Sequence, residues 1–336
     1  MTDLKLGFPV LIGDIGGTNA RFSLITDPNL PALPFEPVRI AAYRDIEDAI
    51  QAAVLDQTQH RPASMMLAIA TPLIGERFRL TNGSWVVDPA RLLDRFGLDA
   101  VVLLNDFSAQ GLAALALGAK DLAVIGDPLP ADDQPKVVIG PGTGLGIAIL
   151  VSIAGKWAII PGEGGHVDLG PRTSREMAIW PHLDQLNGRL SAEMALSGRG
   201  LENLYRGICS LERSEPALAS AAAISQAGIA GDDAAAGEAI RLFLTLLARI
   251  AGDMALVTLA RGGIYIAGGI GAKLLPAIRP EQFHSEFENK SPHEAIMAEI
   301  AICVMTHPLA ALEGLAALAA NPERFSLEQS ALIFTP

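Results

Sequence analysis

Three side chains that can bind a polar ligand lie close together in the segment PGEGGHVDLG, residues 161–170: Glu163, His166 and Asp168. Glycines separate them and let the backbone turn sharply. Carboxylate and imidazole groups are common metal ligands, and they also exchange hydrogen bonds and protons with hydroxyl groups. The segment alone is therefore compatible with a metal site, a proton relay or a site for another polar ligand.

The surrounding sequence does not complete a metal site. No cysteine and no second histidine lies near residues 161–170. The two cysteines of the chain, Cys209 and Cys303, are far apart and belong to no CxxC or CxH pattern. Structural zinc needs four such ligands, so we expect none in this protein.

Two glycine-rich turns elsewhere can hold phosphate groups: GDIGGTN at residues 13–19 and GPGTGLG at residues 140–146. Each lies between apolar runs that predict strands, and glycine lets backbone N–H groups approach an anion closely. Asp14, at the end of the first run, can reach a hydrated magnesium ion. The first turn is not a Walker motif, because no Gly-Lys-Ser/Thr follows it. The second turn lacks the GxGxxG pattern of dinucleotide-binding proteins. An ordinary hairpin turn remains an alternative for both.

Two further segments end a predicted strand and begin a helix. In LLNDFSAQG, Asp106 follows Asn105 at the end of an apolar run, where a carboxylate can accept a proton from a hydroxyl group. The alternative is that Asp106 only caps the helix. In IAGGI, residues 266–270, the paired glycines expose backbone that either contacts an adenine or ribose or only closes a turn.

The order of elements along the chain predicts two α/β units. A strand, a glycine-rich turn and a second strand occur near Asp14 and again near Gly142. Helical periodicity predicts helices at 45–57, 88–95, 107–117 and about 232–259. We expect two domains with a cleft between them. The smaller comprises residues 1–105 plus a C-terminal helix at about 308–336, and the larger comprises residues 106–307.

Composition and charge narrow the function further. The chain has 336 residues, of which 50% are hydrophobic, and a formal net charge of -12, which argues against nucleic acid as the main partner. Residues 137–155 carry no charge, but Pro141 and several glycines favour two buried strands over a membrane helix. No signal peptide is evident. We expect a soluble protein of the cytoplasm.

The joint order of these segments resembles the bacterial ATP-dependent glucokinase family of the hexokinase–actin–sugar kinase superfamily. Seven segments carry the resemblance over nearly the whole chain: LIGDIGGTNARFSL, TNGSW, LLNDFSA, GPGTGLGIA, PGEGGHVDLGP, SAEMALSGRGLENLYR and GGIYIAGGI. PGEGGHVD and LSGxGLxNLYR are the specific ones among them. The resemblance implies an α/β fold with two ribonuclease H-like domains around a cleft, a homodimer, and transfer of the γ-phosphoryl group of MgATP to the 6-hydroxyl of D-glucose. The products are glucose 6-phosphate and ADP, at the entry step of glycolysis.

The resemblance also implies a role for individual residues. Asp106 resembles the general base of the family, which takes the proton from the sugar 6-hydroxyl. Asp14 resembles the residue that holds Mg²⁺ through a water molecule. The implied ATP contacts are Gly13, Asp14, Ile15, Gly16, Gly17, Thr18, Asn19, Gly142, Thr143, Gly144, Gly268 and Gly269. The implied sugar contacts are Asn82, Asn105, Asp106, Glu163, His166 and Glu193. In this interpretation Glu163 and His166 read sugar hydroxyls, and Asp168 holds the loop or the imidazole tautomer.

Three features limit the resemblance. The Cys-rich zinc motif of the repressor–kinase sugar kinases is missing, no helix-turn-helix precedes Gly13, and Arg199 stands where relatives often have proline. A catalytically weak sugar-sensing regulator, or a kinase of a related hexose, is the alternative function. An actin-like filament ATPase would share the phosphate turns but has no use for Glu163, His166 and Glu193 together. Preference among hexoses and phosphoryl donors is left open by the sequence.

Overall fold

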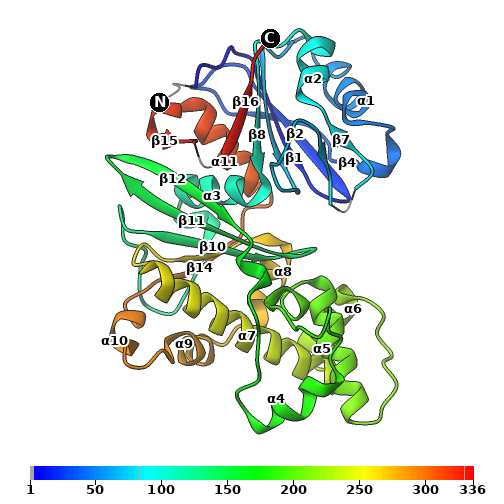
Figure 1. Cartoon of the computed structure of the whole chain (residues 1–336), viewed down its shortest axis with the longest axis vertical. Helices are drawn as coiled ribbons and strands as arrows, with labels where there is room; N and C mark the ends of the chain where they lie inside the picture. The colour runs from blue at the N-terminus through cyan, green and yellow to red at the C-terminus, as the bar shows by residue number, and fades with distance from the viewer. Residues whose placement is uncertain (1–3, 82, 329) are drawn as a thin grey trace. The chain divides into compact units, whose positions relative to one another are not determined.

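The computed structural model describes residues 4–81, 83–328 and 330–336, and the whole chain is drawn in Figure 1. Backbone contacts divide the chain into two compact units, which we describe separately. Unit 1 comprises Met1–Gly118, Leu150–Pro161 and His307–Pro336. Unit 2 comprises Ala119–Ile149 and Gly162–Thr306. The domain boundaries expected from the sequence stay a prediction.

Unit 1 contains a sheet with the strand order β16-β8-β5-β1-β2-β3, in which β4 also pairs with β2. Strands β1, β5 and β8 are parallel, whereas β2 and β16 run antiparallel to their neighbours. The parallel strands are almost continuously apolar and buried, as expected for strands covered on both faces. The strands are Val10–Ile15 (β1), Asn19–Ile25 (β2), Leu33–Pro34 (β3), Val38–Arg39 (β4), Ser64–Ile69 (β5), Ala100–Asn105 (β8) and Ala331–Phe334 (β16).

The register of the three parallel strands aligns their carboxyl ends. Ile15 pairs with Ile69, and Ile69 pairs with Asn105, so the three residues form one row across the sheet. Neighbouring strands are about 4.8 Å apart, so the row places Asn105 about 10 Å from Ile15. The turn after β1 and the helix after β8 therefore begin at the same edge of the sheet.

The helices of unit 1 begin where the sequence supplies a cap. Asp88 accepts a hydrogen bond from the Arg91 amide at the start of α2, as predicted. The helices are Ile46–Ile50 (α1), extended by a π turn at Gln51–Leu55, Pro89–Phe96 (α2), Asp106–Ala116 (α3) and Ala310–Ala320 (α11). Before α2, Phe78–Arg79 (β6) and Val86–Val87 (β7) form an antiparallel pair.

A second sheet has the order β15-β12-β11-β10-β13-β14-β9. Strands β10, β13 and β14 are parallel, and β9 closes the edge antiparallel to β14. The uncharged run at 137–155 forms β10, a glycine turn and β11, as predicted. The strands are Leu122–Ile125 (β9), Lys136–Pro141 (β10), Leu145–Ile153 (β11), Lys156–Gly162 (β12), Ile264–Ile266 (β13), Ile302–Met305 (β14) and Phe325–Ser326 (β15).

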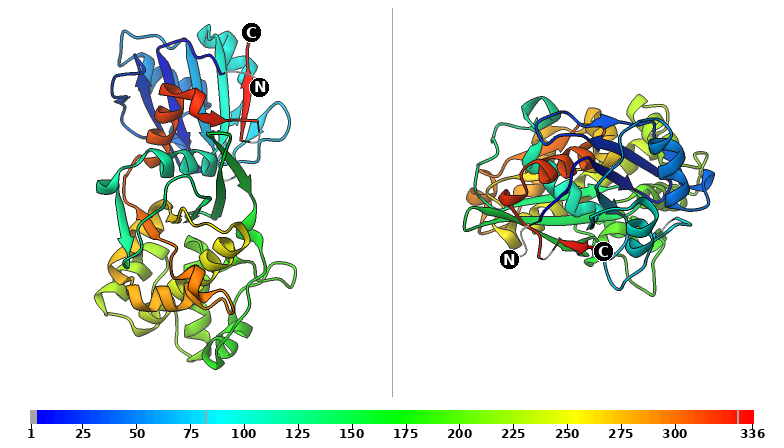
Figure 2. Two further views of the ribbon diagram at one scale, coloured as in Figure 1. Left: turned by 90° about the vertical axis from the view of Figure 1, so that its left-hand side faces the viewer. Right: turned by 90° about the horizontal axis from the view of Figure 1, so that it is seen from above.

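Unit 2 is mostly helical outside its strands, and its long central helix α7 confirms the helix predicted at about 232–259. Helices α5, α6 and α9 pack against α7, as Figures 1 and 2 show. Buried Arg249 of α7 binds Glu176 of α4 and Glu286 of α9, each through a contact of 2.7 Å. The helices are Ser174–Ile179 (α4), Gly198–Leu211 (α5), Ala221–Ala230 (α6), Ala234–Thr258 (α7), Gly268–Leu274 (α8), Pro280–Glu288 (α9) and Glu294–Met297 (α10).

Single turns of 3₁₀ helix complete the described structure: Ile40–Ala42, Ala119–Asp121, Gly164–His166, Trp180–His182, Ala192–Met194, Leu275–Ala277 and Pro322–Arg324. Within the residues that the structure describes, no helix has both the length and the apolar character needed to cross a membrane.

Helices α3 and α11 pack closely against each other in unit 1, and a glycine permits the approach. A Cβ on Gly314 of α11 would overlap the Ala109 carbonyl oxygen and lie 2.6 Å from the Ala113 amide nitrogen of α3. Since backbone atoms line this contact, a larger residue cannot be accommodated by a side-chain rotation. The contact matters for the site because α3 begins with Asp106.

We expect Gly314→Ala to reduce the free energy of unfolding by about 1–3 kcal/mol through overpacking. That loss corresponds to a melting temperature lower by several degrees, measured by circular dichroism. Gly118→Ala is the matched control, because no atom lies within 4 Å of a Cβ at Gly118. Equal melting temperatures for the two variants would contradict the close helix contact.

Candidate active site

The first predicted phosphate turn joins β1 to β2. Ile15 ends β1, Asn19 begins β2, and the Gly16 amide donates to the Asn19 carbonyl oxygen at 3.0 Å. The Gly16-Gly17-Thr18 backbone thus forms a tight connection at the carboxyl edge of the sheet. Such a turn can direct several N–H groups toward one anion.

Asp14 lies beside this turn and is paired with an arginine. Arg21 Nη1 donates to Asp14 Oδ2 at 3.1 Å, because the hairpin register places Arg21 directly opposite Asp14. The Asp14 side chain is 19% exposed. Burial raises the pKa of this carboxyl, and the charge and hydrogen bond of Arg21 only partly offset that effect. Sequence reasoning missed Arg21, although the length of the turn predicts the pairing.

Asn105 and Asp106 occupy the start of α3. Asn105 is the N-cap: its Oδ1 accepts from the Phe107 amide at 2.9 Å, and its Nδ2 donates to the Thr71 carbonyl at 3.4 Å. Asp106 is the first helical residue and also accepts from the Phe107 amide, at 3.0 Å. Asn105 therefore occupies the N-cap position, and the Asp106 carboxylate also accepts from an amide of the first turn, so the roles of Asp106 as base or as helix cap both stay predictions. Asn82, the remaining predicted sugar contact of the N-terminal segment, lies outside the described residues.

The second predicted phosphate turn is surrounded by two helix starts. The Gly142 amide donates to the Gly144 carbonyl at 2.8 Å, and the amide of Gly198, the first residue of α5, donates to the Gly142 carbonyl at 2.9 Å. Gly268, the first residue of α8, has a φ of 82°, and a Cβ there would lie 2.7 Å from the Pro141 carbonyl oxygen. Unit 2 therefore brings the turn with Thr143 next to the Gly268-Gly269 pair.

Glu193 links the predicted sugar site to this turn. Its Oε2 accepts from the Leu145 amide at 3.0 Å, and the same oxygen occupies the space that a Cβ on Gly144 would need. Only a glycine at position 144 leaves room for the carboxylate. This contact could not be predicted from the sequence, because residues 144 and 193 lie far apart along the chain.

Glu163 and His166 share one helical turn, as the glycine spacing suggested. The His166 amide donates to the Glu163 carbonyl at 3.0 Å, and Nε2 of His166 lies 3.9 Å from Oε2 of Glu163. The His166 side chain is 55% exposed and the Glu163 side chain 75%, so both remain available to a ligand. A Cβ on Gly165 would overlap the Leu145 carbonyl, and one on Gly164 would lie 3.0 Å from Ile147. These glycines let the loop lie directly on β11.

Asp168 holds this loop through an arginine. Nη2 of Arg189 lies 2.6 Å from Asp168 Oδ1, and the same nitrogen donates to the His166 carbonyl at 3.0 Å. The loop-holding role proposed for Asp168 is thus supported. No hydrogen bond joins Asp168 to the His166 ring among the described residues. Sequence reasoning missed Arg189.

The described side chains form no metal site of three or more His, Cys, Asp or Glu groups. The predicted residues instead fall into two sets. The first set, in unit 1, is the turn after β1 together with Asn105 and Asp106, all at one sheet edge. The second set, in unit 2, combines the turn after β10 with the start of α8, Glu193 and the 163–166 loop. Each set joins groups suited to phosphate with groups suited to hydroxyls.

The chain is similar to known proteins over nearly its whole length. A family model described as glucokinase matches residues 11–322. The chain belongs to the glucokinase family. The glucokinase of Chelativorans sp. (strain BNC1) is 49% identical over 326 residues, which cover 97% of this chain and 95% of that protein. The glucokinase of Sinorhizobium medicae (strain WSM419) is 47% identical over 326 residues, with coverage of 97% and 96%.

Solved structures agree as well. The crystal structure of glucokinase from an Antarctic psychrotroph superimposes with a TM-score of 0.82 at 28% identity, covering 93% of this chain and 99% of that one. A ROK family glucokinase from Streptomyces griseus, in complex with glucose and AMPPNP, has a TM-score of 0.64 at 19% identity, with coverage of 92% and 98%. The second likeness shows the fold alone. The predicted family, the two-domain hexokinase-type fold and the activity of an ATP-dependent hexose kinase are confirmed.

The contact between Gly144 and Glu193 can be tested through glucose binding. We expect Gly144→Ala to displace the Glu193 carboxylate and to weaken glucose binding by about tenfold or more, since a hydrogen bond to a charged group contributes about 1.5–3 kcal/mol. Glucose affinity is measured by calorimetry in the absence of nucleotide. Gly142→Ala, whose Cβ meets nothing within 4 Å, is the control and should leave glucose affinity unchanged. The same affinity for both variants would disprove the coupling.

The partly buried Asp14 carboxylate leads to a prediction about how stability depends on pH. Its raised pKa means that ionised Asp14 is less favoured in the folded than in the unfolded chain. We expect Asp14→Asn to melt at a higher temperature than the wild type at pH 7. The difference should shrink as the pH falls toward the ordinary aspartate value of 3.8, where both states bind the proton. Exposed Asp94→Asn serves as the control of equal net charge. A lower melting temperature for Asp14→Asn at pH 7 would refute the prediction.

Proposed function

We propose that this member of the glucokinase family transfers the γ-phosphoryl group of MgATP to the 6-hydroxyl of D-glucose with Asp106 as the general base. One observation carries the assignment: the row formed by Ile15, Ile69 and Asn105 sets Asp106 and the first phosphate turn on one sheet edge. A base and a phosphate-binding turn on the same rigid edge are what in-line phosphoryl transfer requires.

Asp106 has a limited chemical task in this proposal. It accepts the proton of the 6-hydroxyl while the sugar oxygen forms a bond to the γ-phosphorus. The bond between that phosphorus and the β–γ bridging oxygen breaks, and the electron pair leaves with ADP. Asn105 caps α3 and so fixes the direction in which the Asp106 side chain extends from the helix.

The sugar contacts proposed for this chain are Asn82, Asn105, Glu163, His166 and Glu193. Carboxylates accept strong charge-assisted bonds from hydroxyl groups, and the imidazole either donates or accepts. The exposed Glu163–His166 pair and the loop-holding Arg189 support this role. A sugar that lacks one hydroxyl leaves a polar group unpaired, at a cost of about 1–3 kcal/mol.

The two glycine turns would bind the phosphates of ATP through backbone N–H groups, and Gly268 and Gly269 would contact the adenosine. Asp14 fits a hydrated Mg²⁺ ion, because it is a partly exposed carboxylate beside the first turn and is held in place by Arg21. When bound, Mg²⁺ neutralises charge on the β- and γ-phosphates. The absence of structural zinc, the homodimer and the cytoplasmic location stay predictions.

The base assignment is tested with Asp106→Asn, which keeps the shape of the side chain but accepts no proton. We expect kcat to fall by about 10²–10⁴-fold, while the dissociation constant of glucose changes by no more than a few-fold. Product formation is followed with a coupled assay for glucose 6-phosphate, and Asp94→Asn is the surface control. Turnover of Asp106→Asn at the wild-type rate would show that another group accepts the proton. A wild-type enzyme that forms no product would instead favour the sugar-sensing alternative.

A further inference from the structure

Helix α3 carries a second polar side chain close to the proposed base. Gln110 follows Asp106 by four residues, so both side chains extend from the same face of the helix. Cβ atoms with this spacing lie about 5–6 Å apart, close enough for a glutamine and an aspartate to share a hydrogen bond. Long helical side chains also lean toward the N-terminus of their helix, which directs the Gln110 amide toward the turn that contains Asp106.

The neighbours of α3 approach it on either side of Gln110. Helix α11 comes closest at the Ala109 carbonyl, and β12 approaches at Gly111, where a Cβ would lie 3.2 Å from a β12 side chain. Successive helical residues are rotated by about 100°, so Gln110 points between these two contacts. Both Gln110 and Asp106 are accordingly half-buried.

The side-chain carbonyl oxygen of Gln110 is buried and unpaired. Within the described part of the chain, Oε1 of Gln110 accepts no hydrogen bond. A buried acceptor without a donor costs about 1–3 kcal/mol. Other buried oxygens in the same position have an ordinary explanation: Oε1 of Glu47 lies 3.1 Å from an Arg91 nitrogen, and the Ser108 hydroxyl can rotate toward a carbonyl of the preceding turn. Gln110 has neither, so its oxygen indicates a donor that arrives during the reaction.

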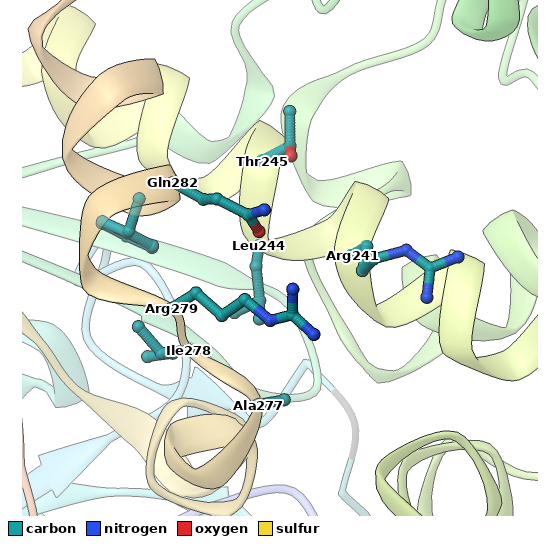
Figure 3. A pocket seen from close by; sticks show the side chains of 8 residues that line it. Arg241, Leu244, Thr245, Ala277, Ile278, Arg279 and Gln282 are labelled. Atoms are coloured by element: carbon teal, nitrogen blue, oxygen red, sulfur yellow. The ribbon is translucent and has the colours of Figure 1, made fainter. Parts of the chain in front are cut away.

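The pocket drawn in Figure 3 offers no comparable chemistry. It lies in unit 2, where α7 faces the segment that leads into α9, and it is lined by residues such as Leu244 and Ile278. Its free space of about 40 Å³ holds only a few water molecules. The unpaired oxygen beside the proposed base is therefore the stronger indication of a further functional group.

We propose that Gln110 is a positioning residue for the base, whose Oε1 accepts a hydrogen bond from Asp106 once Asp106 is protonated. The inference rests on the proposed function and deepens it. Oδ1 of Asp106 already accepts from the Phe107 amide, so the proton of the sugar 6-hydroxyl goes to Oδ2. The O–H bond of the sugar breaks, an O–H bond on Asp106 forms, and the new hydroxyl donates to Gln110. The protonated base is thereby stabilised as the phosphoryl group is transferred.

An uncharged acceptor suits this task. A carboxylate at position 110 would repel the ionised base and favour its protonation before the sugar binds. An apolar residue would leave the protonated base without this acceptor. Glutamine supplies the acceptor without the charge, because its amide oxygen has two lone pairs and does not ionise.

The test compares Gln110→Met, which keeps the size of the side chain but removes the acceptor, with the wild type over a range of pH. We expect kcat to fall about tenfold while the KM of glucose changes no more than about twofold, since Gln110 acts after binding. The acidic limb of kcat against pH reports ionisation of the base, and it should move to lower pH because the protonated form loses its acceptor. Gln110→Glu should move the limb to higher pH, because a second carboxylate disfavours the ionised base. Exposed Gln59→Met is the matched control and should change neither quantity.

The melting temperature of Gln110→Met should not fall, because the change removes an unpaired buried acceptor. A lower kcat with an unchanged pH profile would show a structural role only and overturn the proposal, as would a shift in the same direction for both variants. If Gln110→Met does not fold, the direction of the shift in Gln110→Glu still decides.

The double variant Asp106→Asn, Gln110→Met separates this inference from the base assignment. If Gln110 acts through Asp106, its loss lowers the residual kcat of Asp106→Asn no further. An additional tenfold loss would overturn the proposal. Wild-type turnover of Asp106→Asn would refute the base itself, whereas an impaired Asp106→Asn beside a Gln110→Met that behaves as the wild type would refute only the role of Gln110.

Discussion

The parallel register of β1, β5 and β8 is the constraint on which the chemistry of unit 1 depends. It fixes Ile15, Ile69 and Asn105 in one row, so a turn and a helix that are distant in sequence begin at the same edge. Side chains alternate between the two faces of a strand, and a slip of one residue would turn Asn105 to the opposite face. The buried, apolar character of all three strands makes such a slip costly.

Close backbone approach is the corresponding constraint in unit 2. Gly144 makes room for a carboxylate, Gly165 for a carbonyl of β11, and Gly268 for the carbonyl of Pro141. At each of these glycines, the space that a side chain would fill is occupied by a neighbouring carboxylate or carbonyl group. The turn after β10, Glu193 and the 163–166 loop consequently form one connected structure, in which a change at one glycine is transmitted to a group proposed to bind a ligand.

Many elements of the candidate site could be predicted from local sequence. Glycines and carboxylates at the ends of apolar runs indicate a turn or a helix start at the end of a strand. The two turns, the shared turn of Glu163 and His166, and the start of α3 next to Asp106 follow from such patterns. The contacts of Arg189 with His166 and of Glu193 with Leu145 depend on tertiary packing, which no local pattern encodes. The C-terminal helix expected at about 308–336 is wrong beyond Ala320, where α11 ends and β15 and β16 follow. Strand β16 was missed because ALIF is short and its partner β8 lies more than 200 residues earlier. The sequence left open which of Asn105 and Asp106 caps α3, because Asn and Asp are equally good N-caps.

The helix that carries Asp106 has consequences for how the enzyme is made. Helix α3 is packed by α11, and β8, which leads into it, is paired on its outer side by β16. Both partners are encoded near the end of the chain, long after the strands that they cover. While the ribosome is still adding residues 119–306, α3 and β8 lack these two neighbours, and domains generally fold as units. A nascent chain should therefore remain unable to consume ATP until α11 and β16 have been synthesised.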